Sequence, residues 1–340
     1  MRNMLKSRQT KKAVILIAIC TIALFLLCCQ KGTGAKYTGP VEKITLGLVV
    51  IESSSLAYIA DARGMFKKHG LDVTIIDFSD GPKATDDLLK NRVDVTAVSA
   101  FVFVTKSFQR DELRILASIF RGDTVEISAR KDRGITEPTH LKGRRIGFTR
   151  NTVGDFFLET FLSLHGITIG SVKLVDLKPS EIPEAISSGF VEAAITWEPY
   201  AGKIRDNLGP NAVTWPGQSG QNYQLLLVAR EEFIKERPLA AERLLKALLE
   251  AEKYWSEHAT DAQNLIASRL GYDPVLLQSV WKRCDLRVRL DQDLVILMED
   301  EAKWAMRRRL TEKKEMPNYL RFIHWESLER IKPEAVRIIH

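Results

Sequence analysis

The feature that most constrains how this chain can fold is an alternation of strand and helix that occurs twice. Each copy is predicted to run strand, helix, strand, over residues 43–50, 56–69 and 73–78 and again over residues 145–149, 155–165 and 172–177. Both predicted helices end at a His-Gly pair, where glycine suits a left-handed C-terminal cap. Strands that alternate with helices favour parallel strands in an α/β layer structure.

Short sequence similarities support the repetition. His69-Gly70-Leu71 in the first copy corresponds to His165-Gly166-Ile167 in the second. Residues 88–95 (LLKNRVDV) correspond to residues 186–193 (ISSGFVEA) at a constant offset of 98. Two similarities in the same order predict a pair of similar α/β lobes with central, mostly parallel sheets.

Two further strand-like segments, 124–130 and 223–230, bracket the second copy and are predicted to form a two-strand hinge. This gives lobe one over 43–126 and 229–340, and lobe two over 127–228. The tail is predicted to be helical over 239–258, 260–270, 274–284 and 291–309. Because the chain has by then returned to lobe one, we expect the tail to pack there.

The N-terminus has the order of a secretory signal. Five basic residues precede position 13, and an apolar run broken only by Thr21 then extends from Ala13 to Cys29. The segment 26–29 (LLCC) resembles a bacterial lipobox, so we predict a signal peptide over 1–28, lipid on Cys29 and a linker over 29–42. Cys28 is the alternative lipid site, and an uncleaved membrane anchor is the alternative topology. Either arrangement places the rest of the chain outside the cytoplasm.

Charge and cysteine usage narrow the function. The net charge of the 340-residue chain falls from +7 to +2 when the first 28 residues are removed, so the argument for a nucleic-acid partner is lost. After removal of the signal and lipidation of Cys29, Cys284 is alone, and no disulfide framework can form. No histidine pair has the spacing of a helical zinc site. We therefore expect no metal and no cofactor.

Four segments resemble the nitrate, sulfonate, taurine and thiamine-precursor group of solute-binding proteins, which serve ATP-binding-cassette importers. These segments are 54–60 (SSLAYIA), 64–71 (GMFKKHGL), 141–147 (LKGRRIG) and 197–200 (WEPY). The resemblance implies a type II periplasmic binding protein fold, a small-molecule ligand, importer permease subunits as partners and a monomeric state. Asn91 and Glu192 differ from the glycine and aspartate that are usual in the group.

Ligands of parallel α/β sheets bind beyond the carboxyl ends of the strands, where helices begin. The candidate ligand-binding residues are Ser53, Ser54, Ser55, Ser99, Thr149, Arg150, Asn151, Thr152, Trp197, Glu198 and Tyr223. Helix capping alone could explain the serines and Asn151-Thr152. Arg150 is expected either to bind an anionic group or to pair with Asp155 or Glu159.

Trp197 and Glu198 suit a ligand with a planar ring or an amine. In the alternative interpretation, Trp197 packs against Tyr200 and Glu198 is solvated. The combined prediction is a lipid-anchored solute receptor without enzyme activity. A thiamine-pyrimidine-synthase-like enzyme on the same fold, or a lipoprotein that binds a peptide or protein, are the alternatives.

Overall fold

The computed structural model describes residues 37–218 and 220–339, and the elements below belong to the unit formed by 39–340. The predicted signal peptide, Cys29 and the first part of the linker lie outside the described residues. Within the described ranges, no helix combines the length and the apolar character that crossing a membrane requires.

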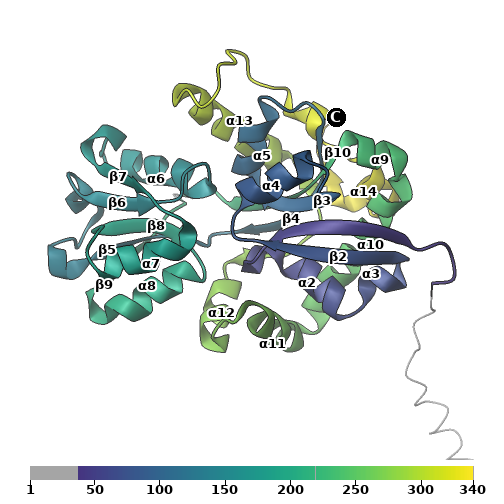
Figure 1. The fold of residues 1–340 in the computed structure, drawn as a ribbon, viewed down its shortest axis with the longest axis horizontal. Coiled ribbons are helices and arrows are strands. Elements are labelled where there is room, and N and C mark those ends of the chain that lie inside the picture. The colour runs from purple at the N-terminus through teal and green to yellow at the C-terminus, as the bar shows by residue number, and fades with distance from the viewer. Residues whose placement is uncertain (1–36, 219, 340) are drawn as a thin grey trace, which may run out of the picture. The chain divides into compact units, whose positions relative to one another are not determined.

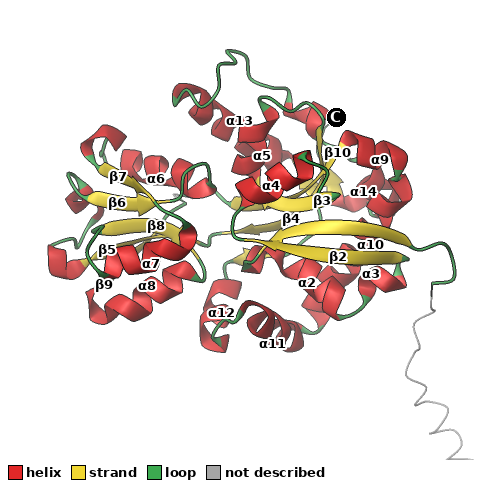
Figure 2. Ribbon diagram, viewed as in Figure 1, coloured by secondary structure: helices red, strands yellow, loops and turns green. Residues whose placement is uncertain are grey.

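The first sheet combines parallel and antiparallel strands in the order β11-β4-β10-β3-β1-β2. Its strands are β1 (Glu42–Val49), β2 (Leu71–Phe78), β3 (Val95–Ser99), β4 (Leu113–Gly122), β10 (Tyr223–Arg230) and β11 (Cys284–Asp285). β1 pairs in parallel with β2 and β3, whereas β10 runs antiparallel between β3 and β4. Helices cover both faces of this sheet (Figure 2).

The second sheet has the order β7-β6-β8-β5-β9. Its strands are β5 (Val125–Arg130), β6 (Arg145–Phe148), β7 (Lys173–Asp176), β8 (Ala193–Trp197) and β9 (Ala212–Pro216). β6 is parallel to β7 and β8, and β5 runs antiparallel between β8 and β9. The α/β fold class with two similar lobes is thereby confirmed.

The repeated sequence pattern corresponds to a repeated topology. The neighbours β2-β1-β3 in one sheet match β7-β6-β8 in the other, with an antiparallel strand added beside the third. Val95 and Ala193, which the offset of 98 aligns, are the first residues of β3 and β8. The acids just before them also correspond. Asp94 accepts the Thr45 backbone N–H at 2.7 Å, and Glu192 accepts that of Arg145 at 2.8 Å.

Helices of lobe one are α2 (Ser55–Ala62), α3 (Met65–Lys68), α4 (Gly81–Leu89) and α5 (Ala100–Ser107). Those of lobe two are α6 (Val153–Leu164), α7 (Ile182–Ser187) and α8 (Tyr200–Leu208). The single helix predicted over 56–69 is wrong, because the chain breaks at Gly64, whose φ of +67° glycine adopts without steric cost. Gly70 and Gly166 have positive φ, as the predicted caps require.

The tail is helical, as predicted. It contains α9 (Glu231–Glu236), α10 (Pro238–Glu257), α11 (Ala259–Leu270), α12 (Pro274–Trp281), α13 (Gln292–Arg307) and α14 (Glu326–Ile331), with a short pairing of β12 (Leu290–Asp291) and β13 (Val336–Arg337). α10 packs on α2 and α3, and α13 packs on α5 (Figure 1). The tail therefore completes the first lobe.

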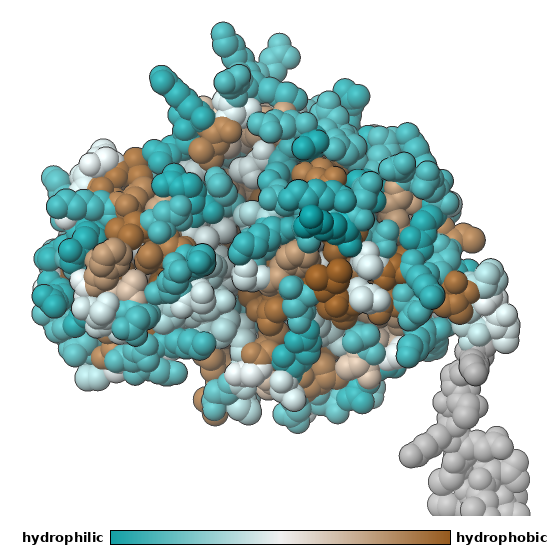
Figure 3. All heavy atoms as spheres, in the orientation of Figure 1, coloured by the Kyte–Doolittle hydropathy of each residue, from teal (hydrophilic) through white to brown (hydrophobic). Residues whose placement is uncertain are grey.

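Hydrophilic side chains cover most of the face in Figure 3, and apolar areas lie between them.

The chain changes sheet twice, between β4 and β5 and between β9 and β10. The side chain of Gln218 joins the two crossings: its Oε1 accepts the backbone N–H of Thr124 at 2.7 Å and of Val125 at 3.0 Å. Its Nε2 donates to the carbonyls of Gly122 and Gln221. The predicted strands 124–130 and 223–230 exist, but they lie in different sheets. The boundaries between the lobes, which the sequence analysis places at 126/127 and 228/229, stay a prediction.

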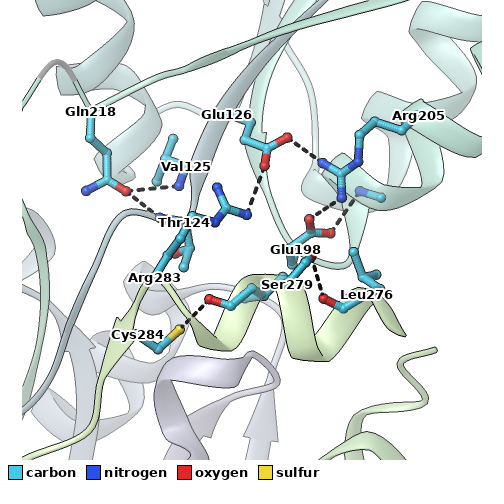
Figure 4. Close-up of polar contacts among 12 residues, drawn as sticks. Thr124, Val125, Glu126, Glu198, Arg205, Gln218, Leu276, Ser279, Arg283 and Cys284 are labelled. Atoms are coloured by element: carbon cyan, nitrogen blue, oxygen red, sulfur yellow. Dashed lines mark hydrogen bonds and ion pairs between the residues drawn. The ribbon is translucent and has the colours of Figure 1, made fainter. Parts of the chain in front are cut away.

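The lobes also contact each other away from the crossings. Phe101 of α5, Phe156 of α6 and Trp304 of α13 form an aromatic cluster with ring centroids 5.4–6.0 Å apart. Trp304 Nε1 donates to Glu159 of α6 at 3.0 Å. On the other side of the cleft, Arg283 bonds Glu126 at 3.0 Å (Figure 4). The lobes are thus held together on two sides.

We expect Gln218→Ala to lower the free energy of unfolding by about 2–4 kcal/mol, because it leaves buried backbone groups at both crossings without partners. Gln278→Ala, which changes an exposed glutamine on α12, is the matched control. Urea denaturation of both variants measures the difference. Equal stability of the two variants would show that other contacts hold the crossings.

Candidate functional site

A cavity lies between the two lobes, at the carboxyl ends of β1, β3 and β8. It encloses about 470 Å³ of space between atoms, its solvent-open mouth included. Its lining consists of Val49, Ile51, Glu52, Gly81, Ser99, Val102, Thr124, Val125, Thr152, Val153, Trp197, Tyr223 and Leu225. Small-molecule sites are mainly apolar with a few polar groups, and this lining has that composition.

A larger groove of about 1,620 Å³, its open mouth included, lies elsewhere, between the start of β4 and the segment after α13. It is lined largely by charged and polar side chains, including Arg114, Glu231 and Lys313. The smaller cavity fits a binding site better, because it lies at the carboxyl ends of parallel strands and its walls are buried.

Four of the predicted site residues line the cavity: Ser99, Thr152, Trp197 and Tyr223. Ser99 Oγ accepts the backbone N–H of Val102 at 3.2 Å and caps α5. Thr152 Oγ1 accepts that of Gly154 at 3.3 Å and caps α6. Both residues therefore hold a helix N-terminus at the cavity.

Trp197 combines the two roles that the sequence had set against each other. It is 8% exposed and packs with Val49 and Ile51 of the opposite lobe. Its ring lies edge-on to that of Tyr200, with centroids 6.4 Å apart. Its indole Nε1 is buried without a hydrogen-bond partner. Trp197 thus joins the lobes and also brings an unused donor to the cavity region.

The three serines at the start of α2 lie behind the cavity wall. Ser53 Oγ is 3.4 Å from the hydroxyl of Tyr223, and Ser54 Oγ donates to the Val49 carbonyl at 2.8 Å. Ser55 Oγ donates to the carbonyl of Glu52. All three are buried, so their hydroxyls stabilise the turn after β1.

The segment 149–151 is not part of the lining. Thr149 Oγ1 donates to the carbonyl of Leu177 at 2.9 Å. Arg150 is half-exposed, lies over the ring of Phe148 and bonds Asp176 at 3.2 Å, so the expected pairing with Asp155 or Glu159 is wrong. Asn151 has a positive φ of 60°. The sequence places these residues near a helix start, but their side chains turn to other partners.

Glu198 is fully buried, which contradicts the alternative interpretation of a solvated carboxylate, and it does not line the cavity. It accepts the backbone N–H of Gly202 at 2.8 Å and bonds Arg205 at 2.5 Å. Arg205 also bonds Glu126, which Arg283 approaches from the tail (Figure 4). The charge of Glu198 is therefore neutralised within this network.

Glu52 is the residue that the candidate list missed, although the sequence shows an acid directly after a buried strand. It is 3% exposed and lines the cavity. Its Oε2 accepts a hydrogen bond from the Tyr272 hydroxyl at 3.3 Å. Burial raises the pKa of Glu52 to about 7, and the nearby charge of Glu198 adds to the rise, while hydrogen bonds oppose it.

Burial of Glu52 makes stability depend on pH. The folded protein holds this proton more tightly than the unfolded chain, so stability falls as pH rises from about 4.5 to about 7 and then levels off. We expect Glu52→Gln to raise the stability of the ligand-free protein by up to about 3 kcal/mol at pH 8. The gain should vanish near pH 4. Melting temperatures across this range measure it, and a gain independent of pH would contradict the assignment.

Comparison with known proteins places this geometry in a family. A Brucella abortus protein named as a binding protein is 25% identical over 230 residues, which are 66% of this chain and 70% of the relative. A Bacillus subtilis protein named for binding aliphatic sulfonates is 24% identical over 313 residues, or 89% and 92% of the two chains. A pyrimidine phosphate synthase of Aspergillus parasiticus is 21% identical over 211 residues, or 58% and 61%.

The solved structure of an alkanesulfonate-binding protein from Xanthomonas axonopodis, bound to MOPS, superposes with a TM-score of 0.72. It is 14% identical and covers 84% of this chain and 99% of its own, which shows a shared fold. Residues 53–262 match the model of the NMT1/THI5-like family. Because that match spans more than half of the sequence, the chain belongs to the NMT1/THI5-like family.

Proposed function

We propose that this protein is an extracytoplasmic solute-binding lipoprotein that captures a small organic or anionic solute and delivers it to an ATP-binding-cassette importer. The observation that carries the proposal is the position of the cavity. Val49, Glu52 and Ser99 come from one lobe, and Thr152 and Trp197 from the other. A bound solute would contact both lobes and so stabilise the closed arrangement.

The relatives support this function. The Bacillus subtilis and Xanthomonas axonopodis proteins are named for binding sulfonates, and the first aligns over nearly the whole chain. A solute binds here simply by contacting both lobes. A permease, in contrast, would have to recognise the shape that the two lobes form together when they are closed. Closure of this fold around the cavity would provide that shape.

The synthase relative keeps an enzyme as the second candidate. The two candidates differ in what they release. Purified protein can be denatured and its bound small molecule identified by mass spectrometry. A binding protein returns the same molecule after incubation with native protein, whereas a synthase yields a new product. A new product would refute the transport proposal.

With the identified solute, Trp197→Phe should abolish the change in tryptophan fluorescence on binding. The reason is that Trp197 lines the cavity and lacks a partner for its indole N–H. Trp255→Phe, which changes a tryptophan stacked on Trp281 in the tail, should keep the signal. A signal that survives in the Trp197 variant would place the solute elsewhere.

Processing of the N-terminus tests the lipid anchor. We expect Cys29→Ala to leave an unprocessed precursor, because the lipid acceptor is lost, and Cys284→Ala to mature normally. Gel mobility and labelling with a fatty acid measure both. Normal maturation of the Cys29 variant would rule out Cys29 and make Cys28 the next candidate.

A further inference from the structure

The lining of the cavity has an unusual charge composition. Among the described residues that form it, Glu52 alone carries an acidic or basic side chain. Most of the remaining wall is apolar, with Val102, Val125, Val153 and Leu225 among its members. No arginine or lysine in this described lining could neutralise an anionic solute. The charge of the cavity is therefore complementary to a cation.

The helix N-termini at the cavity are each capped by one side chain. α4, α5 and α6 begin there, and N–H groups at such ends can bind anions. However, Asp80 caps α4 by accepting the Lys83 N–H at 3.0 Å, and Ser99 and Thr152 cap α5 and α6. Each side chain takes up one of the free backbone donors that its helix N-terminus could offer to an anion.

Glu52 has no counter-ion among the described residues. Its Oε2 accepts a hydrogen bond from Tyr272, a neutral group, at 3.3 Å. The nearest basic network belongs to other acids, because Arg205 pairs with Glu198 and Glu126. A buried carboxylate without a positive partner is costly, and a cationic ligand would supply that partner.

We propose that the solute is an amine with an apolar body, whose ammonium group binds Glu52 while its body fills the apolar wall beside Trp197. This inference rests on the proposed solute-binding function and names the ligand class. Trp197 contributes twice, since its ring face can attract the cation and its surface is apolar. The class differs from the sulfonates for which the relatives are named.

The same geometry makes binding depend on pH. Glu198, Tyr223, Tyr272 and Cys284 lie near enough to Glu52 for their charges to interact with its own. Burial raises the pKa of both tyrosines and of the thiol, so these three stay neutral near pH 7, and Arg205 neutralises Glu198. With the pKa of Glu52 at about 7, an ammonium ligand must displace its proton below that pH. Affinity should therefore rise about tenfold per unit from pH 5 toward pH 7 and then level off.

The test uses benzylamine with benzoate and benzenesulfonate, three probes of similar size that differ in charge. Calorimetry at pH 8 should detect binding of benzylamine alone. Glu52→Gln should weaken that binding about tenfold or more and remove its pH dependence. Glu301→Gln is the matched control, because Glu301 is also buried but lies in α13 and does not line the cavity. It should leave affinity unchanged.

Proton release is the second readout. Near pH 7, benzylamine should displace a proton from the protonated fraction of Glu52, which appears as a heat that varies with the buffer. The Glu52→Gln variant should lose this heat, whereas loss of packing alone would not remove it.

The outcomes separate the inference from the function on which it rests. Binding of benzoate or benzenesulfonate in preference to benzylamine would overturn the amine assignment and leave the solute-binding function in place. Failure of benzylamine to bind at all would also overturn it. If, in addition, purified protein releases no small molecule on denaturation, the solute-binding function fails as well.

Discussion

The structure depends on how the backbone crosses between its two large sheets. Each crossing between them removes backbone groups from the strand ladders, and buried groups of this kind must find other partners. One side chain, Gln218, satisfies two N–H groups and two carbonyls at this point. Because an amide has both donors and acceptors, it can join the two crossings without introducing a charge. The position of the lobes, and hence of the cavity, follows from this joint.

The cavity is what remains when the carboxyl ends of two similar sheets face each other. Apolar contact closes one side through Phe156 and Trp304, and charge pairing closes the other through Glu126 and Arg283. The strengths of these two kinds of contact respond differently to salt concentration, because salt weakens partly exposed ion pairs more than aromatic packing. Closure therefore depends on more than one kind of interaction.

The topology of the parallel core could be predicted from the sequence because it is repeated. The register of β3 and β8 agrees with the offset of 98, and Asn91, at a positive φ of 58°, aligns with Gly189 of the second copy, whose φ is 80°. The strands β4 and β9, which pair antiparallel with β10 and β5, were not predicted, and they lie outside the repeated strand-helix-strand pattern. Arg150 shows a second limit of prediction from the sequence. Its position after a strand was predictable, but its pairing with Asp176 depends on which strand lies beside it.

Buried acids in this protein differ in what surrounds them, and that difference separates structure from function. Asp94 and Glu192 are partly buried, but each accepts a backbone N–H from the neighbouring strand, so their role in joining strands is complete. Glu301 is buried with one oxygen unpartnered, and burial raises its pKa well above the usual range. Glu52 matches neither case, because it lines a cavity, lacks a counter-ion and has a pKa of about 7. Burial alone does not mark a binding residue. A buried acid that lines a cavity and can still change its charge is a candidate binding residue, because a ligand can supply the counter-ion that the fold lacks.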